Sequence, residues 1–456
     1  MKPHDGRYFM KSPFHPEFPF RPKSSPFFYG WWILVSSSIG IIASIPGQTT
    51  GFSVFTGVLE EALDLSASRI SMAYLVGTVG SALLLPSVGR LFDRFGARHL
   101  GTLVCLVMGI GLLYLSQVDR IASLLSAHLP VIPCGAIAFT AISLGFFWLR
   151  FTGQGALTMT SRSMLGKWFN QYRGISISIS GMVVGFSFSL APRTFDLMIQ
   201  SIGWRWTWAS LGIILMTGIL FLVWLTYRDN PEQCGLKMDG IENPKPRKHT
   251  NEDLVIHHDF TRAEATRTRS FWIFNISLGL HSFLITGYTF HVIAIAEELG
   301  IARDAILHAF VPSSVIGIIA SLLAGALSSR IRLKSVLFFL PFGGLLFSVG
   351  PAFHLQHTLW LIMLGCGLSS GLFGLITGLV WPRFFGRKHL GAIAGVNMAT
   401  LVYSSASAPL VFSLCRDFTE HFDSVFIGIV VLTGCCMIAS FFADNPQRYY
   451  LKQPSD

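Results

Sequence analysis

The chain has 456 residues, of which 51% are hydrophobic and only 13% are charged, and its mean hydropathy is +0.55. Soluble domains carry about 25% charged residues, so this composition argues against a cytosolic globular protein, and the long apolar runs exclude a disordered chain. The net charge of +10 would suggest nucleic acid as a partner for a soluble protein. In a membrane protein Lys and Arg collect in loops on one side, so we expect a lipid bilayer and no nucleic acid.

Apolar runs follow one another along the chain, each long enough for a transmembrane helix, which needs about 20 residues. A porin-type barrel would need alternating strands of about ten residues, whereas these runs are continuous and about twice as long. We therefore predict an all-α membrane protein. The first six spans are expected at 29–60, 68–89, 99–117, 137–167, 174–199 and 205–227, and the second six at 270–297, 305–328, 334–353, 358–382, 390–415 and 422–443.

A polar segment separates the two groups of six spans. We predict a cytoplasmic tail over 1–28, a six-helix bundle over 29–228, a cytoplasmic linker over 229–268, a second bundle over 269–444 and a cytoplasmic tail over 445–456. The first tail has no apolar stretch and no small-residue cleavage site, so the first span is expected to be retained. The seven cysteines include no CxxC pair, so neither a disulfide framework nor a zinc site is expected.

The fourth span is ambiguous because the apolar stretch 132–169 is long for one helix and contains Arg150 and Arg162. Splitting it would give thirteen spans and reverse the orientation of everything downstream. With twelve spans and an internal N-terminus, most of the 34 Lys and Arg residues, including Arg162, fall on the cytoplasmic side, and Arg150 stays in the membrane. We therefore expect twelve spans with both termini in the cytoplasm.

The two halves repeat one another at an offset of about 215 to 240 residues. A single match could arise by chance, but four matches in the same order indicate a duplicated six-helix unit. In this architecture a solute binds near the midplane, between the repeats. The matching pairs are 89–98 with 325–334, 167–169 with 383–385, 229–232 with 444–447, and 46–49 with 286–289.

The segment 89–98 (GRLFDRFGAR) resembles the loop between spans two and three of the major facilitator superfamily. Four other segments resemble its monocarboxylate and oxalate/formate-type branch. The resemblance covers about residues 29 to 444 and implies two six-helix bundles that rock about a central solute site. The four segments are 166–174 (GKWFNQYRG), 203–206 (GWRW), 229–236 (DNPEQCGL) and 381–386 (WPRFFG).

By resemblance, this loop latches the inner gate in the outward-facing state. Gly89 allows two helices to approach closely, and Gly96 permits a tight turn. Asp93 can pair with arginines and cap a helix N-terminus of the other half, whereas Ser329 in the second half should latch more weakly. An ordinary positive-inside loop is the alternative. The predicted gating residues are Gly89, Asp93, Arg94, Gly96, Arg98 and Arg330.

Ionisable residues inside a bilayer are costly and persist mainly where they serve a pathway. Arg150 lies about 25 Å along the helix from Lys167, in the outer half of the membrane. Gln154 and Thr158 follow it at a spacing that places all three on one helix face. A guanidinium binds a carboxylate through two parallel hydrogen bonds, so we predict a small organic anion as the solute. Snorkelling of Arg150 to the outer headgroups is the alternative.

Polar residues on three further spans complete the predicted solute site. The seventh span carries two histidines and a tyrosine on one face, for which core packing is an equally common outcome. The first span contains Pro46-Gly47, where a helix can unwind at a binding site or simply kink. The eleventh span has a polar stripe that can serve helix contacts alone. The predicted solute-binding residues are Arg150, Gln154, Gln48, Tyr288, His281, His291 and Asn397.

The sequence departs from the resembled carriers in the eighth and eleventh spans. Such carriers place a basic residue in the eighth span, and oxalate carriers add a lysine in the eleventh. Here the eighth span has only His308 and the eleventh has no lysine, so oxalate or lactate is not implied. No acid lies near the midplane, which leaves either a histidine that titrates with a coupled proton or exchange against a counter-anion.

Other functions fit the sequence less well. We predict no catalytic residue, metal or cofactor: His257-His258-Asp259 has no second cluster beside it, and there is no phosphate-binding loop for ATP-driven transport. A channel would not require the gate loop. A transporter-like sensor without flux is the strongest alternative from another class, and a carrier of a neutral or zwitterionic metabolite is the alternative within the family. We expect a monomer in a bacterial inner membrane.

Overall fold

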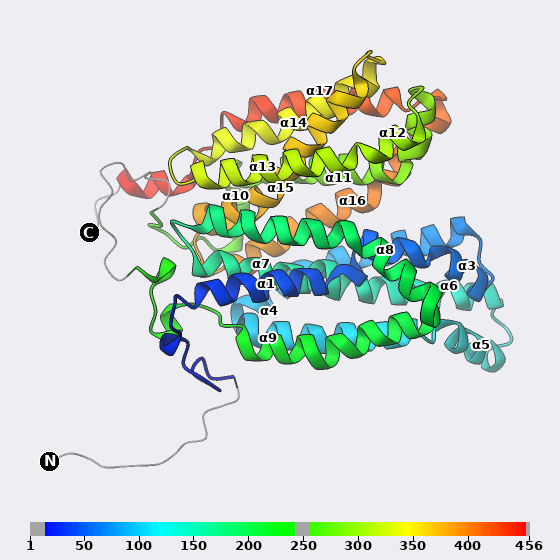
Figure 1. The fold of residues 1–456 in the computed structure, drawn as a ribbon, viewed down its shortest axis with the longest axis horizontal. Helices are drawn as coiled ribbons and strands as arrows, with labels where there is room; N and C mark the ends of the chain where they lie inside the picture. Colours follow the sequence, from blue (N-terminus) through cyan, green and yellow to red (C-terminus); the bar gives the residue numbers. More distant parts are fainter. Residues whose placement is uncertain (1–13, 242–254, 453–456) are drawn as a thin grey trace, which may run out of the picture.

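The computed structural model describes residues 14–241 and 255–452. Within these ranges every regular element is a helix, and the long helices run side by side in two bundles (Figure 1). The predicted all-α fold with two six-helix bundles is therefore confirmed. The two ends of the chain, 1–13 and 453–456, and the middle of the expected linker, 242–254, lie outside the described residues.

The first bundle contains nine α-helices joined by short turns. Two 3-10 turns, Ile45–Gly47 and Ser53–Phe55, interrupt the first span, and π-helical segments at Arg150–Leu157 and Leu215–Ile219 continue the fourth and sixth spans. The helices are α1 (Gly30–Ala43), α2 (Thr49–Phe52), α3 (Thr56–Leu63), α4 (Ala67–Leu115), α5 (Val118–His128), α6 (Cys134–Leu149), α7 (Thr158–Trp168), α8 (Arg173–Ile214) and α9 (Leu220–Thr226).

The second bundle is more regular. The short linker helix α10 (Arg262–Arg267) leads into it and begins with a capping box between Thr261 and Glu264. The helices of the bundle are α11 (Arg269–Glu298), α12 (Arg303–His308), α13 (Phe310–Leu327), α14 (Leu333–Phe353), α15 (Thr358–Phe384), α16 (Leu390–Thr419) and α17 (Asp423–Ser440).

All twelve predicted spans correspond to helical crossings. In the described part of the chain, nine helices are long and apolar enough to cross a membrane, and α1 is a shorter apolar helix at the start of the first span. Two of the nine contain two spans each, which meet at Gly96 (φ 80°) and Gly203 (φ 78°). A positive φ is accessible to glycine at little cost, so the chain turns back there without a longer loop.

The fourth span is a single crossing. α6, the π-helical segment and α7 form one continuous helical run over 134–168, so the long apolar stretch holds one span and the alternative with thirteen spans is wrong. The additional helix α5 packs beside α6 at the end where the fourth span begins, and the spans predicted from hydropathy do not include it (Figure 1).

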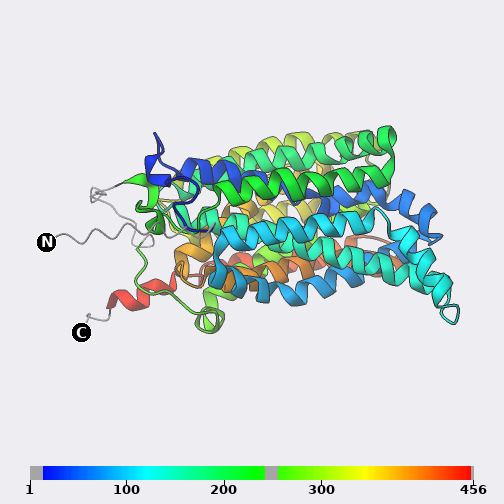
Figure 2. The ribbon, with the colours of Figure 1, turned by 90° about the horizontal axis from the view of Figure 1, so that it is seen from below.

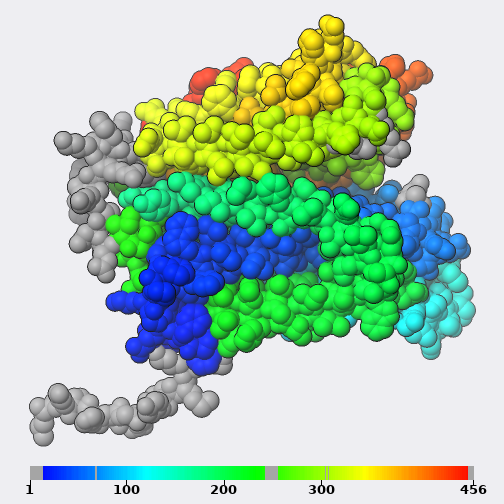
Figure 3. Space-filling model, viewed as in Figure 1, coloured from blue at the N-terminus to red at the C-terminus, as the bar shows by residue number. Residues whose placement is uncertain are grey.

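The two ends of the molecule differ. The start of α1 and the 3-10 helix Pro446–Lys452 lie at the same end, which we call the terminal end (Figure 2). At this end the bundles are in contact, as the space-filling view shows (Figure 3), and the ribbons diverge toward the opposite end (Figure 1). The described ends of the linker also lie at the terminal end, and each caps a loop of one bundle. Asp239 accepts hydrogen bonds from backbone amides of residues 170–172, and Asp259 accepts them from those of Arg387 and Lys388.

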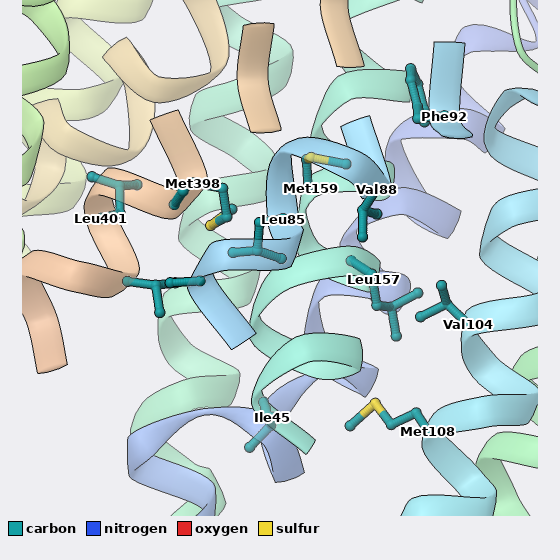
Figure 4. Packing of buried hydrophobic residues seen from close by; sticks show 14 of the residues in the cluster. Ile45, Leu85, Val88, Phe92, Val104, Met108, Leu157, Met159, Met398 and Leu401 are labelled. Atoms are coloured by element: carbon teal, nitrogen blue, oxygen red, sulfur yellow. The ribbon is translucent and has the colours of Figure 1, made fainter. Parts of the chain in front are cut away.

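Small residues allow this close contact. A Cβ on Gly89 would overlap the carbonyl oxygen of Gly391, and a Cβ on Gly174 would overlap that of Gly325. Buried apolar side chains continue the interface inward: Leu85 of α4 and Met159 of α7 approach Met398 of α16 in Figure 4. These close contacts, at the packing density of a protein interior, join the two bundles at the terminal end.

Candidate functional site

The first span is broken at Ser44–Gln48. Pro46 lies in the 3-10 turn Ile45–Gly47, and Gln48 has an extended backbone (φ −94°, ψ 156°) before α2 resumes the helix. Gly47 lies directly against the fourth span, where an added Cβ would overlap the carbonyl oxygen of Leu149. The break therefore brings free backbone groups of the first span against the π-helical segment, in the middle of the bundle.

Arg150 begins the π-helical segment and points at this break. Its side chain is 2% exposed, and Nη1 donates to the carbonyl oxygen of Gly47 and to Oγ1 of Thr49, both at 3.3 Å. The guanidinium also lies over the ring of Tyr74, 5.1 Å from its centroid. Tyr74 OH and Thr49 Oγ1 are 2.7 Å apart, so one polar cluster joins the first, second and fourth spans.

The charge of Arg150 is incompletely satisfied. Its Nε and Nη2 atoms are buried and have no hydrogen-bond partner, and none of the salt bridges between described residues involves this side chain. A buried charge is costly unless it is paired and hydrogen-bonded. The Nε and Nη2 atoms form one edge of the guanidinium, and a carboxylate could accept two parallel hydrogen bonds from that edge.

A second polar cluster joins the same pair of spans at Thr158, eight residues beyond Arg150. Gln48 Nε2 donates to Ser44 Oγ (3.1 Å) and to Thr158 Oγ1 (3.2 Å), and Ser44 and Thr158 are 2.9 Å apart. Thr158 Oγ1 also donates to the carbonyl oxygen of Gly153, five residues back, and the backbone amide of Thr158 donates to the same oxygen and closes the wider π-helical turn. The structure therefore brings Arg150, Gln48 and Thr158 to the same break in the first span.

Gln154 lies on the π-helical segment between these clusters. Its backbone nitrogen approaches Gly47, and its Oε1 is buried without a hydrogen-bond partner. The sequence spacing assumes an α-helix here, whereas the structure has a wider, π-helical turn over Arg150–Leu157. Thr49 and Tyr74 were not in the predicted site. Thr49 follows Gln48 directly, whereas no pattern in the second span distinguishes Tyr74.

The predicted residues of the seventh span lie within the second bundle. His281 packs on Phe373 of α15, with the ring centroids 4.7 Å apart. Tyr288 is 1% exposed and packs edge-on against Phe347 of α14. His291 Nε2 lies 3.1 Å from the carbonyl oxygen of Pro409 in α16. These three side chains contact helices of their own bundle, and the structure does not bring them to Arg150.

Asn397 lies at the interface between the bundles. Its Nδ2 donates to Asn275 Oδ1 at 2.8 Å, and Asn275 in turn donates to Thr400. Asn397 also lines a small cavity of about 30 Å³ together with residues of α7 and α15. One of these is Arg162. The charge pattern of the sequence groups it with the cytoplasmic loop cations, whereas the structure places it on α7 inside the bundle.

The predicted gating residues divide into two groups. Asp93 reaches the second bundle, where its two carboxylate oxygens accept hydrogen bonds from the amides of Gly391 and Ala392, each at 2.8 Å. These amides begin α16, so the carboxylate also meets the positive end of that helix. Its hydrogen bonds therefore go to backbone amides and not to an arginine. Gly89, one turn earlier, packs on Gly391.

The other gating residues do not bridge the bundles. At the turn of Gly96, Asp229 accepts hydrogen bonds from the amides of Ala97 and Arg98. Arg98 is buried and donates to the carbonyl oxygens of Trp224 and His15, within the first bundle and its N-terminal segment. Arg94 and Arg330 are exposed at the terminal end.

Among the described residues, no group of three or more His, Cys, Asp or Glu side chains could hold a metal ion. The linker residues His257 and His258 instead donate their backbone amides to Gln447 Oε1, at 2.9 Å each. The polar groups gathered at the centre of the first bundle are a guanidinium, amides and hydroxyls, which suit recognition of a solute by hydrogen bonds.

Comparison with curated proteins finds distant relatives that are transporters. The chain is 23% identical to monocarboxylate transporter 13 of Rattus norvegicus over 418 residues, covering 89% of this chain and 87% of that protein. It is 22% identical to the glucose transporter GlcP of Staphylococcus epidermidis over 436 residues, covering 86% and 91%. The match to the uncharacterized MFS-type transporter YhjX of Escherichia coli, 23% identical, spans only about half of each chain, 53% and 52%.

Solved structures show the same fold. The E. coli fucose:proton symporter FucP superimposes with a TM-score of 0.60 at 13% identity, over 91% of this chain and 99% of that one. The proton:xylose symporter XylE gives a TM-score of 0.62 at 17% identity, over 91% and 95%. A family model described as Major Facilitator Superfamily matches residues 37–409. With this match over most of the chain, the protein is a multi-pass membrane transporter that belongs to the Major Facilitator Superfamily.

Proposed function

We propose that the protein carries a small organic anion across the membrane by alternating access, and that a carboxylate of the solute binds Arg150. The observation that carries this proposal is the guanidinium of Arg150, buried beside the break in the first span with two nitrogens unpartnered. Membership of the superfamily supports secondary transport, and the distant likeness to a monocarboxylate transporter is consistent with an anionic solute.

We place the terminal end in the cytoplasm of a bacterial cell, following the distribution of Lys and Arg in the sequence. The conformer in which the bundles meet at Asp93 and Gly391 is then the one closed to the cytoplasm. Rocking of the bundles would break these contacts and expose the solute to the other side. His281 and His291 remain candidates for proton coupling, and exchange against a counter-anion is the alternative.

The test is uptake by the purified protein in liposomes, with labelled pyruvate, lactate, acetate and succinate as probes. We expect saturable uptake of at least one probe. Arg150→Ala should abolish it and Arg150→Lys should weaken it strongly, because an ammonium lacks the planar pair of donors. Arg193→Ala, a change at an exposed arginine on α8, is the matched control and should transport normally. Normal carboxylate uptake by Arg150→Ala would refute the proposal.

The same experiment separates the alternatives. The likeness to a glucose transporter makes a neutral solute the second candidate, so labelled glucose is included as a probe. Glucose uptake that is unaffected by Arg150→Ala would favour a carrier of neutral solutes. Binding of a carboxylate, seen as a thermal shift, without any flux would indicate a sensor. Uptake measured with and without an imposed pH gradient distinguishes proton coupling from anion exchange.

A further inference from the structure

Arg162 is a second cation inside the bundle. It lies on α7, about one turn beyond Thr158 toward the terminal end. Every other residue of α7 is buried, so this helix is enclosed by protein and does not face lipid. Arg162 is partly exposed only because it lines the cavity between the bundles. It forms no hydrogen bond or ion pair with any described residue.

The two bundles build this cavity together. α7 of the first bundle supplies Arg162 and Ser163, while α15 and α16 of the second supply Trp381 and Asn397. The indole Nε1 of Trp381 is buried and has no hydrogen-bond partner. A buried polar group without a partner calls for an explanation, and here two unpartnered donors line one small space. Because the guanidinium of Arg162 and the indole N–H of Trp381 both donate hydrogen bonds and no carboxylate lines the cavity, the cavity suits an anion.

Snorkelling does not account for the position of Arg162. The residue lies five positions before Lys167, about 7.5 Å along the helix, so its side chain is long enough to reach the terminal end. In the structure it lines the internal cavity, and the contact of Gly166 with Pro382 lies beneath it. A guanidinium inside the bundle without an ion pair is costly, which favours a role on the solute path.

We propose that Arg162 is a second anion-binding residue, which holds the carboxylate of the solute on the terminal side of the centre. This inference rests on the proposed function. Arg150 and Arg162 are separated by about 18 Å along the fourth span, so one small carboxylate cannot bind beside both at once. The two guanidinium groups would therefore be occupied in succession as the solute crosses.

The size of the cavity indicates which conformer uses it. Its volume of about 30 Å³ admits a water molecule or two but not a three-carbon acid. Opening of the terminal end would part α7 from α15 and α16 and enlarge it. Arg162 therefore serves the conformer open at the terminal end, whereas Arg150 serves the conformer open at the opposite end.

The test measures the two sides separately, with the carboxylate that the wild-type protein transports. In liposomes of defined orientation, Arg162→Ala should raise KM for solute presented at the terminal end at least tenfold and leave KM at the opposite end within twofold. Arg162→Lys should restore part of the loss. Arg90→Ala, at an exposed arginine of the terminal end, is the matched control and should change KM on neither side of the membrane.

A binding measurement provides an independent readout. Titration of the same carboxylate should quench the fluorescence of the wild-type protein, and Trp381→Phe should remove most of this quench. If Arg162→Ala fails to fold, Arg162→Gln, of similar size, takes its place. Unchanged KM on both sides would overturn the role of Arg162 while leaving carboxylate transport through Arg150 intact. Absence of carboxylate transport by the wild-type protein would refute the proposed function and this inference together.

Discussion

Replacement of Asp93 by asparagine tests the contact that closes the terminal end. The carboxylate accepts two hydrogen bonds, each 2.8 Å long, from the first amides of α16 in the other bundle. An asparagine of the same shape keeps one carbonyl acceptor but turns an NH₂ group toward the second amide. One bond is lost, the other becomes neutral, and the interaction with the positive end of α16 disappears.

The size of the effect follows from these losses. A hydrogen bond to a charged group contributes about 1.5 to 3 kcal/mol, and a neutral one contributes about 1 kcal/mol. For a half-buried site we expect Asp93→Asn to destabilise the closed conformer by roughly 2 to 4 kcal/mol. Since about 1.4 kcal/mol corresponds to a factor of ten, the ratio of closed to open molecules should fall roughly 30- to 1000-fold.

The assay is the distance between two spin labels at the terminal end. Arg90 on α4 and Arg332 before α14 are exposed and belong to different bundles, so labelled cysteines at these positions report on closure. We expect a population at longer distance in Asp93→Asn, with expression and unfolding temperature near those of the unsubstituted protein. Ser329→Asn, at the equivalent position of the second half, is the matched control. An unchanged distance distribution in Asp93→Asn would refute the reasoning.

Two further predictions concern packing and topology. Gly89→Val should prevent closure of the terminal end and abolish transport without preventing folding, because even a Cβ would overlap the carbonyl oxygen of Gly391. The distance between the same pair of spin labels measures this closure. Normal transport by Gly89→Val would contradict the prediction. A membrane-impermeant maleimide applied to intact cells should label Cys134, the exposed first residue of α6, because the fourth span begins on the side opposite the terminal end. Cys234 should stay unlabelled even in opened cells at pH 7.4, since burial raises the pKa of its thiol to about 12 and keeps it protonated. Loss of the label in Cys134→Ser is the control, and labelling of Cys134 only from the cytoplasmic side would reverse the proposed orientation.

The pattern of apolar and charged residues along the chain was sufficient to predict the fold. The apolar spans and their split into two bundles follow from continuous apolar runs, because a helix in a bilayer must be apolar over about 20 residues and must satisfy its own backbone. The single crossing of the fourth span followed from a second pattern, the distribution of Lys and Arg between the two sides. The turn at Gly96 could also be read from the loop sequence, since the φ of 80° found there is one that glycine tolerates and most residues do not.

The candidate solute site could be predicted only in part from the sequence. Arg150 stands out in the sequence because a charge is rare in an apolar span, and Gln48 because it follows Pro46-Gly47. The π-helical form of the fourth span over Arg150–Leu157 was not predicted, and the packing of Gly47 against this segment is visible only in three dimensions. Tyr74 joins Arg150 through a contact between distant spans, which no local spacing encodes.

The sequence by itself determined which segments cross the membrane, how they are grouped and which charges are unusual, because these depend on the polarity of successive residues along one helix. Only the tertiary structure decided which face of each helix meets another. It placed Arg162 in a cavity between the bundles and turned Asp93 to the amides of α16. The physical reason is that the pattern along one helix records the polarity of its residues but not what they face. Whether a polar side chain meets water, a cavity or the other bundle depends on neighbours that are hundreds of residues away.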